Sequence, residues 1–194
     1  MKKEKKINQA EHILNTAYKC LSTKGHAKIS LRNIANEAGV ALSQLHYYFG
    51  SKNALYSQLI TKSIGTYIDD FTEKLSTNTE GINSIDQLVR FIENAVFNDE
   101  AMVRVFYDVT NLALWSEEFR GLMNKMLDEI SDIIEEKIIN NNTLVPPLVN
   151  ENPKAIARLL VSVLLGSTIQ FIFSPSSRDE ISESNKLLPS LLLG

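Results

Sequence analysis

Hydrophobic residues recur every three or four positions along most of this chain. Such a period predicts amphipathic helices, whereas strict alternation of hydrophobic and polar residues would predict strands. The first predicted helix, about 8–23, has one apolar face made by Ala10, Ile13, Leu14, Ala17, Cys20 and Leu21. The same period predicts helices over about 31–38, 41–49, 51–75, 84–97, 99–115, 117–139 and 154–173, and a short one near 184–193 that Pro189 interrupts. The fold class is therefore predicted to be all-α.

The breaks between these helices have the expected composition. Gly25 is suited to end the first helix, and Ser51 is suited to begin the fourth. The polar stretch "STNTEGINS" (76–84) is the clearest break, and "NNNTLVPPLVNENP" (140–153) is a second loop by composition.

One segment, Ala157 to Phe173, is apolar nearly all round. It is interrupted by Ser162, Ser167, Thr168 and Gln170. A transmembrane helix needs about 20 apolar residues, so we expect this segment to be too short for a membrane span and to form a buried core helix.

Charge divides the chain unevenly. Residues 1–60 hold nine Lys/Arg and three Asp/Glu, whereas residues 61–194 hold eleven and twenty. A basic part joined to an acidic part suggests a polyanion-binding segment attached to a segment with another role.

The cysteine count and the N-terminal sequence indicate a cytoplasmic protein. Cys20 is the only cysteine, which excludes an intrachain disulfide and a multi-thiolate metal site. This usage fits a reducing compartment. The first residues, "MKKEKKINQAEH", are charged but lack the apolar run of a secretory signal.

Residues 30–49 have the pattern of a helix-turn-helix. Ser30 is a favourable N-cap for its first helix, and Gly39 suits the left-handed residue that ends it. Val40 is the apolar turn residue that fills the gap between the helices.

The geometry of the next helix separates its inner and outer faces. With Leu45 at the centre of the buried face and a rotation of about 100° per residue, Tyr48 and Phe49 flank Leu45. Ser43 and Tyr47 then point away from the core. On the sides of the helix lie Leu42, Gln44 and His46. Outward polar and aromatic groups on such a helix can reach base edges and phosphates in a major groove of double-stranded DNA.

Neighbouring residues support DNA binding. Arg32 can reach a phosphate or a base edge, and Ser30 is a small hydrogen-bond donor. Lys52 lies at the start of the fourth helix, where the helix dipole also favours an anion. A basic arm that could follow the DNA backbone is formed by Lys2, Lys3, Lys5 and Lys6.

At these positions the chain resembles the TetR (tetracycline-repressor-like) family of transcriptional regulators. The resemblance covers about 50 residues and is carried by Ser30, Arg32, Ile34, Ala35, Ala38, Gly39, Val40, Leu45, Tyr48, Phe49, Lys52 and Leu55. It implies a DNA-binding domain over 1–52 and a helical effector-binding and dimerisation domain over 53–194, joined by the long helix 52–75.

Two residues depart from the pattern of the family. Ala41 stands where a Ser or Thr usually caps the recognition helix, so the cap is expected to come from elsewhere. His46 stands where a Tyr commonly contacts phosphate, so that contact is expected to be weaker or pH-dependent.

The family's second domain usually holds a ligand cavity. Methionine and aromatic side chains suit an adaptable cavity for an apolar or cationic small molecule. The candidate lining residues are Met102, Phe106, Tyr107, Asn111, Trp115, Met123, Met126 and Phe171. Asp108 is a further candidate for a polar contact with the ligand.

The resemblance also implies a mechanism. A homodimer, formed through the helix 154–173 and the C-terminal segment, would present two recognition helices to a palindromic operator. A ligand that favours one tilt of the fourth helix would release the DNA, most commonly relieving repression.

Other functions remain open at this point. The second domain could serve dimerisation alone, without a ligand, or the chain could be a protein-interaction module without a DNA role. An enzyme is disfavoured because the sequence has no Ser–His–Asp order, phosphate-binding loop or glycine-rich nucleotide motif. No cofactor, metal or membrane partner is expected.

Overall fold

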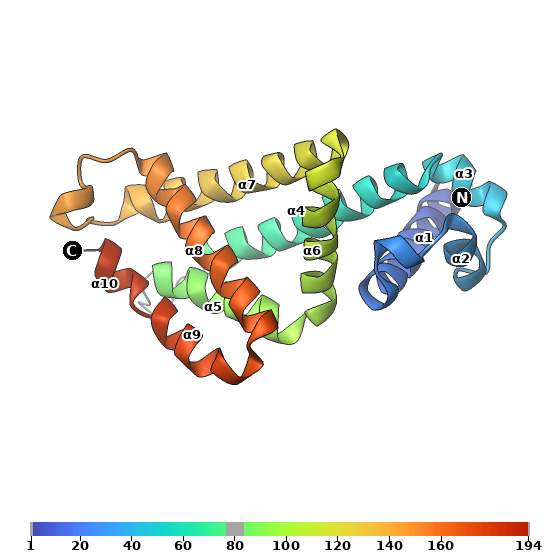
Figure 1. The fold of residues 1–194 in the computed structure, drawn as a ribbon. Coiled ribbons are helices and arrows are strands. Elements are labelled where there is room, and N and C mark those ends of the chain that lie inside the picture. Colours follow the sequence, from blue (N-terminus) through green and yellow to red (C-terminus); the bar gives the residue numbers. More distant parts are fainter. Residues whose placement is uncertain (1, 77–83, 194) are drawn as a thin grey trace. The chain divides into compact units, whose positions relative to one another are not determined.

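The fold is all-α, as the hydrophobic period predicts (Figure 1). The computed structural model describes residues 2–76 and 84–193, so most of the predicted loop 76–84 lies outside the described residues. Ten α-helices lie in this part of the chain: α1 (Lys2–Lys24), α2 (Leu31–Glu37), α3 (Leu42–Phe49), α4 (Lys52–Ser76), α5 (Ser84–Asn98), α6 (Glu100–Trp115), α7 (Glu117–Lys137), α8 (Pro153–Phe173), α9 (Arg178–Asn185) and α10 (Leu188–Leu192). The only β pairing among these residues is an isolated bridge between Leu144 and Leu193.

The helices form two compact units. The first contains the residues up to Gly65 together with Glu100–Met123, and the second contains Thr66–Asp99 and the residues from Asn124 onward. Helices α4 and α7 contribute residues to both units.

The first unit is built around α1. Its fully buried residues include Ile13, Ala17, Ile34, Leu45 and Leu55, from four different helices. Helix α1 starts at Lys2, six residues earlier than the pattern predicts. It ends at Gly25, which has a φ of +74° and donates its N–H to the carbonyl of Leu21, as expected of a C-cap.

Cys20 lies in this core. Its side chain is buried, and burial together with the Glu37 carboxylate raises the pKa of the thiol. The thiol is therefore held in its protonated, unreactive form.

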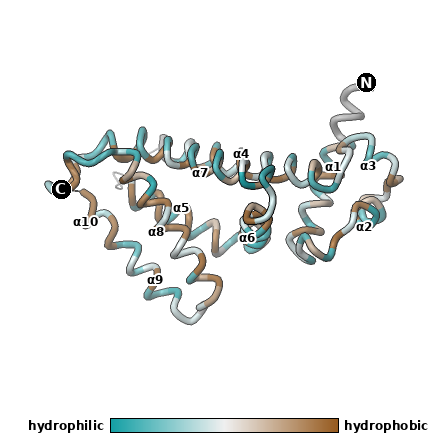
Figure 2. The backbone as a smooth tube through the Cα atoms, turned by 45° about the horizontal axis from the view of Figure 1, so that its top comes forward, coloured by the Kyte–Doolittle hydropathy of each residue, from teal (hydrophilic) through white to brown (hydrophobic). Residues whose placement is uncertain are grey.

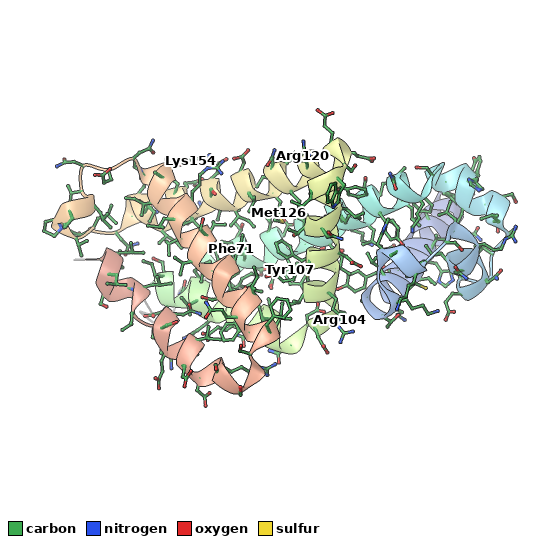
Figure 3. All side chains as sticks on the ribbon, viewed as in Figure 1. Phe71, Arg104, Tyr107, Arg120, Met126 and Lys154 are labelled. Carbon is green, nitrogen blue, oxygen red and sulfur yellow. The ribbon has the colours of Figure 1, made fainter. Side chains whose placement is uncertain are left out.

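The second unit has its core between α5, α7 and α8. The cluster includes the fully buried Ile85, Leu88, Ile134, Ile138 and Ala157. Ion pairs between α7 and α8 flank this core. They join Asp132 to Lys154, which is labelled in Figure 3, and Asp128 to Arg158.

The C-terminal segment differs from its prediction. In place of one helix near 184–193, α9 ends at Asn185 and α10 begins at Leu188. Pro189 lies in the first turn of α10. Backbone N–H groups in the first turn have no partner within the helix, so the N–H that proline lacks is not needed there. Figure 2 shows α10 as hydrophobic, whereas α9 is mostly hydrophilic.

Helix α8 is longer than the apolar run that predicts it. It has 21 residues, and an 18-residue window within it has a mean hydropathy of 1.9. By length and composition alone it could cross a membrane, so the expectation that it is too short is wrong. The prediction of a core helix is confirmed, because Ile156, Leu160 and Leu164 are buried in the cluster of the second unit.

Candidate nucleic-acid interface

Helix α2 is fixed at its beginning by a capping box and at its end by the turn that leads to α3. Ser30 accepts the N–H of Asn33 at 3.2 Å, and Asn33 Oδ1 accepts the N–H of Ser30 at 3.0 Å. This reciprocal pair is a capping box. Gly39, with a φ of +65°, reverses the chain after α2, and the N–H of Val40 bonds the carbonyl of Ala35 at 3.0 Å.

Helix α1 also contacts the end of α2, where this turn begins. The Nε2 atom of His12 lies 3.0 Å from the carbonyl oxygen of Ala38 at the C-cap of α2. Because a carbonyl only accepts, this contact requires the tautomer with hydrogen on Nε2. His12 therefore helps to set the direction in which α3 leaves the turn.

The two faces of α3 are as the helical rotation predicts. Leu45 is fully buried and Phe49 is buried, whereas Ser43, His46 and Tyr47 are exposed. The side chain of Tyr47 is 66% exposed, and its ring meets that of Tyr48 edge-on with 5.3 Å between centroids. The outward face therefore presents a hydroxyl, an imidazole and a phenol on a helix anchored from inside.

The beginning of α3 lacks a side-chain cap at Ala41, which has no acceptor. Gln44 compensates from within the helix, because its Oε1 accepts the N–H of Ala41 at 3.1 Å. Its amide nitrogen remains available as a donor. Leu42, the first residue of α3, is half-buried.

His46 also acts within the protein. Its Nδ1 lies 2.9 Å from the carbonyl of Gly50, at the C-cap of α3. The carbonyl requires hydrogen on Nδ1, which leaves Nε2 as an acceptor in the neutral ring and as a donor in the protonated ring.

The cations predicted near the interface lie in different surroundings. Arg32 is exposed on α2. The ammonium of Lys52 instead donates to the carbonyl of His26 at 2.7 Å inside the first unit. Lys2, Lys3, Lys5 and Lys6 belong to the first turns of α1, and their side chains lie outside the described part of the structure.

A small cavity brings together three of the predicted ligand residues, Met102, Phe106 and Met123. It is lined also by Ile60, Ser63, Ile64, Val105 and Val109, and its volume is about 10 Å³. A cavity of this size holds about one water molecule.

Five predicted ligand residues are not brought to this cavity. Asn111 and Trp115 are exposed at the end of α6, and Met126 and Phe171 are buried in the second unit. Tyr107 follows Phe106 on α6 (Figure 3), and burial of its hydroxyl raises its pKa to about 12.

Asp108 has a role that sequence reasoning missed. Its Oδ2 accepts the backbone N–H of His26 at 2.8 Å, 82 positions away in the chain. No local sequence pattern indicates a contact between a helix and a distant connector, so only the folded structure identifies it. Within the described residues, no group of three or more His, Cys, Asp or Glu could hold a metal ion.

Residues 13–59 match the family of bacterial regulatory proteins described as the tetR family. An HTH-type transcriptional regulator in the dhlA 5' region of Xanthobacter autotrophicus is 25% identical over 179 residues, covering 91% of this chain and 86% of its own. IcaR of Staphylococcus aureus, the negative transcriptional regulator of the biofilm operon icaADBC, is 25% identical over 130 residues, which is 66% of each chain. The chain belongs to the TetR family.

A solved structure shares the fold of this TetR-family chain. A transcriptional regulator of Saccharomonospora viridis, crystallised in complex with choline, superposes with a TM-score of 0.76 at 17% identity, covering 95% of this chain and 97% of its own. The match to the family and the two relatives show that this TetR-family chain is a DNA-binding transcriptional regulator. It has an N-terminal helix-turn-helix and a helical C-terminal part. Its relatives are regulators rather than enzymes.

Proposed function

We propose that this regulator is a homodimeric repressor that binds a palindromic operator in the cytoplasm and is released by a small molecule. The observation that carries the proposal is the exposed face of α3, with Ser43, His46 and Tyr47 on a helix anchored by Leu45. The first turn of α3 would contribute Leu42 and the free amide nitrogen of Gln44.

Ser30 and Arg32 would contact the phosphate backbone beside α3. Both residues are exposed at the start of α2. Contacts to phosphates fix the position of a protein on DNA, whereas contacts to base edges select the sequence. The proposed division of roles is therefore positioning by α2 and base selection by α3.

The surface of α8 supports a dimer. Several apolar side chains on α8 and the C-terminal segment are exposed in the single chain: Leu159, Val163, Ile169, Ile172, Phe173, Leu187 and Leu191. An exposed apolar surface of this kind is typical of an interface between subunits. A second copy of α8 and the C-terminal segment would cover these residues around a two-fold axis.

The effector is proposed to enter beside Met102, Phe106 and Met123. Their cavity of about 10 Å³ is far smaller than the several hundred cubic ångströms of a ligand pocket, so binding there would require these flexible side chains to move. The choline found in the Saccharomonospora viridis structure favours a cationic effector, and the mostly apolar lining of the cavity favours an apolar one. The negative regulator IcaR favours repression over activation.

The small volume of that cavity also favours a second candidate, a regulator that responds to no ligand. In that case the second domain would serve dimerisation alone. The two candidates predict the same DNA site and differ only in whether a small molecule changes the affinity for it.

Selection of bound DNA from a random pool tests the DNA site. We expect recovery of an inverted repeat with half-sites about one helical turn apart. Recovery of unrelated sequences, or binding of one half-site per chain, would refute the palindromic dimer.

Titration with small molecules tests release. Operator affinity would be measured by fluorescence anisotropy with choline, with a hydrophobic quaternary ammonium dye and without additive. Release by either compound supports the effector-controlled repressor. Direct binding of both without any change in operator affinity supports the second candidate.

A further inference from the structure

The connector between α1 and α2, residues 25–30, forms hydrogen bonds with side chains from two other helices. His26, in this connector, donates its backbone N–H to Asp108 of α6 at 2.8 Å. The carbonyl of the same residue accepts a hydrogen bond from Lys52 Nζ, at the start of α4, at 2.7 Å. Both backbone groups of one residue are therefore fixed by charged side chains.

The ammonium of Lys52 lies in a partly desolvated place. Its Nζ is 5.6 Å from the centroid of the fully buried Tyr56 ring, within range of a cation–π contact. Burial lowers the pKa of Lys52, and the Asp108 carboxylate opposes that shift. The carbonyl of His26, the ring of Tyr56 and the carboxylate of Asp108 thus stabilise the positive charge of Lys52 within the protein.

Gly25 precedes His26 and lies beside Asp108. Its φ of +74° favours glycine. A Cβ at this position would lie 3.4 Å from Asp108 Oδ2, which is an ordinary contact distance, so the carboxylate itself does not require glycine here. The imidazole of His26 packs against the ring of Tyr56, with 4.8 Å between centroids.

We infer that Lys52 is a positioning residue that, together with Asp108, fixes the connector leading into the helix-turn-helix, and that its ammonium does not neutralise a DNA phosphate. The inference rests on the proposed DNA-binding function and changes the role of one residue in it. If Lys52 turned outward to a phosphate, the carbonyl of His26 would lose its shorter hydrogen bond and keep only the 3.4 Å bond from the N–H of Ile29. The half-buried Asp108 would also lose a compensating charge. The connector ends at Ser30, the N-cap of α2, so its position sets where α2 begins.

The salt dependence of DNA binding separates the two roles of Lys52. Each phosphate contact contributes about 0.9 to the slope of log K against log salt concentration. We would measure this slope for the full-length protein and for Lys52→Gln, with Arg32→Gln as an exposed cation of the proposed interface. Lys62→Gln serves as a control, because Lys62 is an exposed lysine of α4 that pairs with Glu11.

We expect Lys52→Gln to weaken operator binding about five- to tenfold with an unchanged slope, because one internal hydrogen bond is lost. Arg32→Gln should lower the slope by about 0.9. A fall of the same size in Lys52→Gln would overturn the inference.

A second variant keeps the test decisive if Lys52→Gln does not fold. Lys52→Arg retains a positive charge that binds phosphate well but does not fit the position between His26 and Tyr56. We expect Lys52→Arg to bind DNA about as weakly as Lys52→Gln. Binding equal to that of the unmodified protein would contradict the inference.

A measurement without DNA distinguishes this inference from the proposed function. Hydrogen exchange should become faster in residues 25–30 of both Lys52→Gln and Asp108→Asn, and combining the changes should add little. Unchanged exchange would refute the inference that Lys52 and Asp108 fix the connector. Absence of DNA binding by the unmodified protein would instead refute the proposed function, and the positioning role in DNA binding with it.

Discussion

At the scale of single residues, the exposed side chains of α3 that are proposed to contact DNA differ from the buried ones that stabilise the fold. Tyr47 is 66% exposed, whereas Leu45 on the opposite face is fully buried. A change at Tyr47 therefore tests function with little effect on folding, and a change at Leu45 would do the reverse. The same distinction applies to His46, except that its Nδ1 also holds the carbonyl of Gly50.

Tyr47→Ala should weaken operator binding by about 1–3 kcal/mol, the usual cost of losing a base contact. The free energy of unfolding should change by less than about 0.5 kcal/mol, since the position is largely exposed. Fluorescence anisotropy and urea denaturation measure the two quantities. Trp115→Ala is the control, because Trp115 is 86% exposed on α6, outside the proposed interface, and should leave operator affinity unchanged.

His26 should make stability depend on pH. Burial, and then the nearby Lys52 ammonium, lower its pKa below the ordinary value of 6.5. The unfolded chain then binds a proton at a higher pH than the folded protein, so stability is fully retained above pH 6.5 and falls as the pH decreases through the folded pKa. Urea denaturation between pH 7.5 and 5 should show a smaller loss of stability for His26→Gln than for the unmodified protein. Equal losses would contradict the prediction.

At the scale of helices, the sequence was sufficient where the local pattern decides the structure. The periodic segments gave all the long helices, and Ser30, Gly25 and Ser51 mark helix ends as expected; Ser51 Oγ accepts the N–H of Ala54 at 3.1 Å. The sequence was insufficient where distant contacts decide. Gln44 as a substitute cap, Asp108 on the connector and the separation of α9 from α10 all depend on groups that a periodic pattern does not register.

The cap of α2 can be separated from a DNA contact at the same residue. Ser30→Ala should destabilise the protein by about 1 kcal/mol, because it removes the acceptor for the N–H of Asn33. Ser30→Asp should keep the cap and the stability, since aspartate is also a good N-cap. Its negative charge should nevertheless weaken operator binding by repelling phosphate. Thermal unfolding and anisotropy report the two effects, and full operator affinity of Ser30→Asp would exclude a nearby phosphate.

At the scale of the whole molecule, the exposed apolar surface of α8 is the proposed contact with a second copy of the chain. Half-sites on a palindrome require two recognition helices, so loss of the dimer should also lower operator affinity. The sequence predicted that α8 is apolar nearly all round, and the structure separates its buried residues, such as Leu160 and Leu164, from exposed ones such as Leu159 and Phe173. Only the exposed set is available to a partner.

Leu159→Asp should convert the proposed dimer to a monomer. Leu159 is 56% exposed in the single chain, and the interface would bury it. An aspartate at this position would place an unpaired charge in the interface, which is costly. Sedimentation velocity measures the oligomeric state, and anisotropy should show weaker operator binding. Leu114→Asp is a matched control at a residue 66% exposed in the first unit. A variant Leu159→Asp that remains dimeric would show that the subunits meet elsewhere.

The buried thiol of Cys20 has a practical consequence for labelling the protein with fluorescent dyes. Because the sulfur is inside the core of the first unit and its pKa is raised, it should not react with maleimide reagents while the protein is folded. A single cysteine introduced at the solvent-facing position of Trp115 would then be the sole site of dye attachment, with the native cysteine left in place. In the proposed dimer, two copies labelled in this way would allow distance changes between them to be recorded by fluorescence energy transfer without first preparing a cysteine-free background.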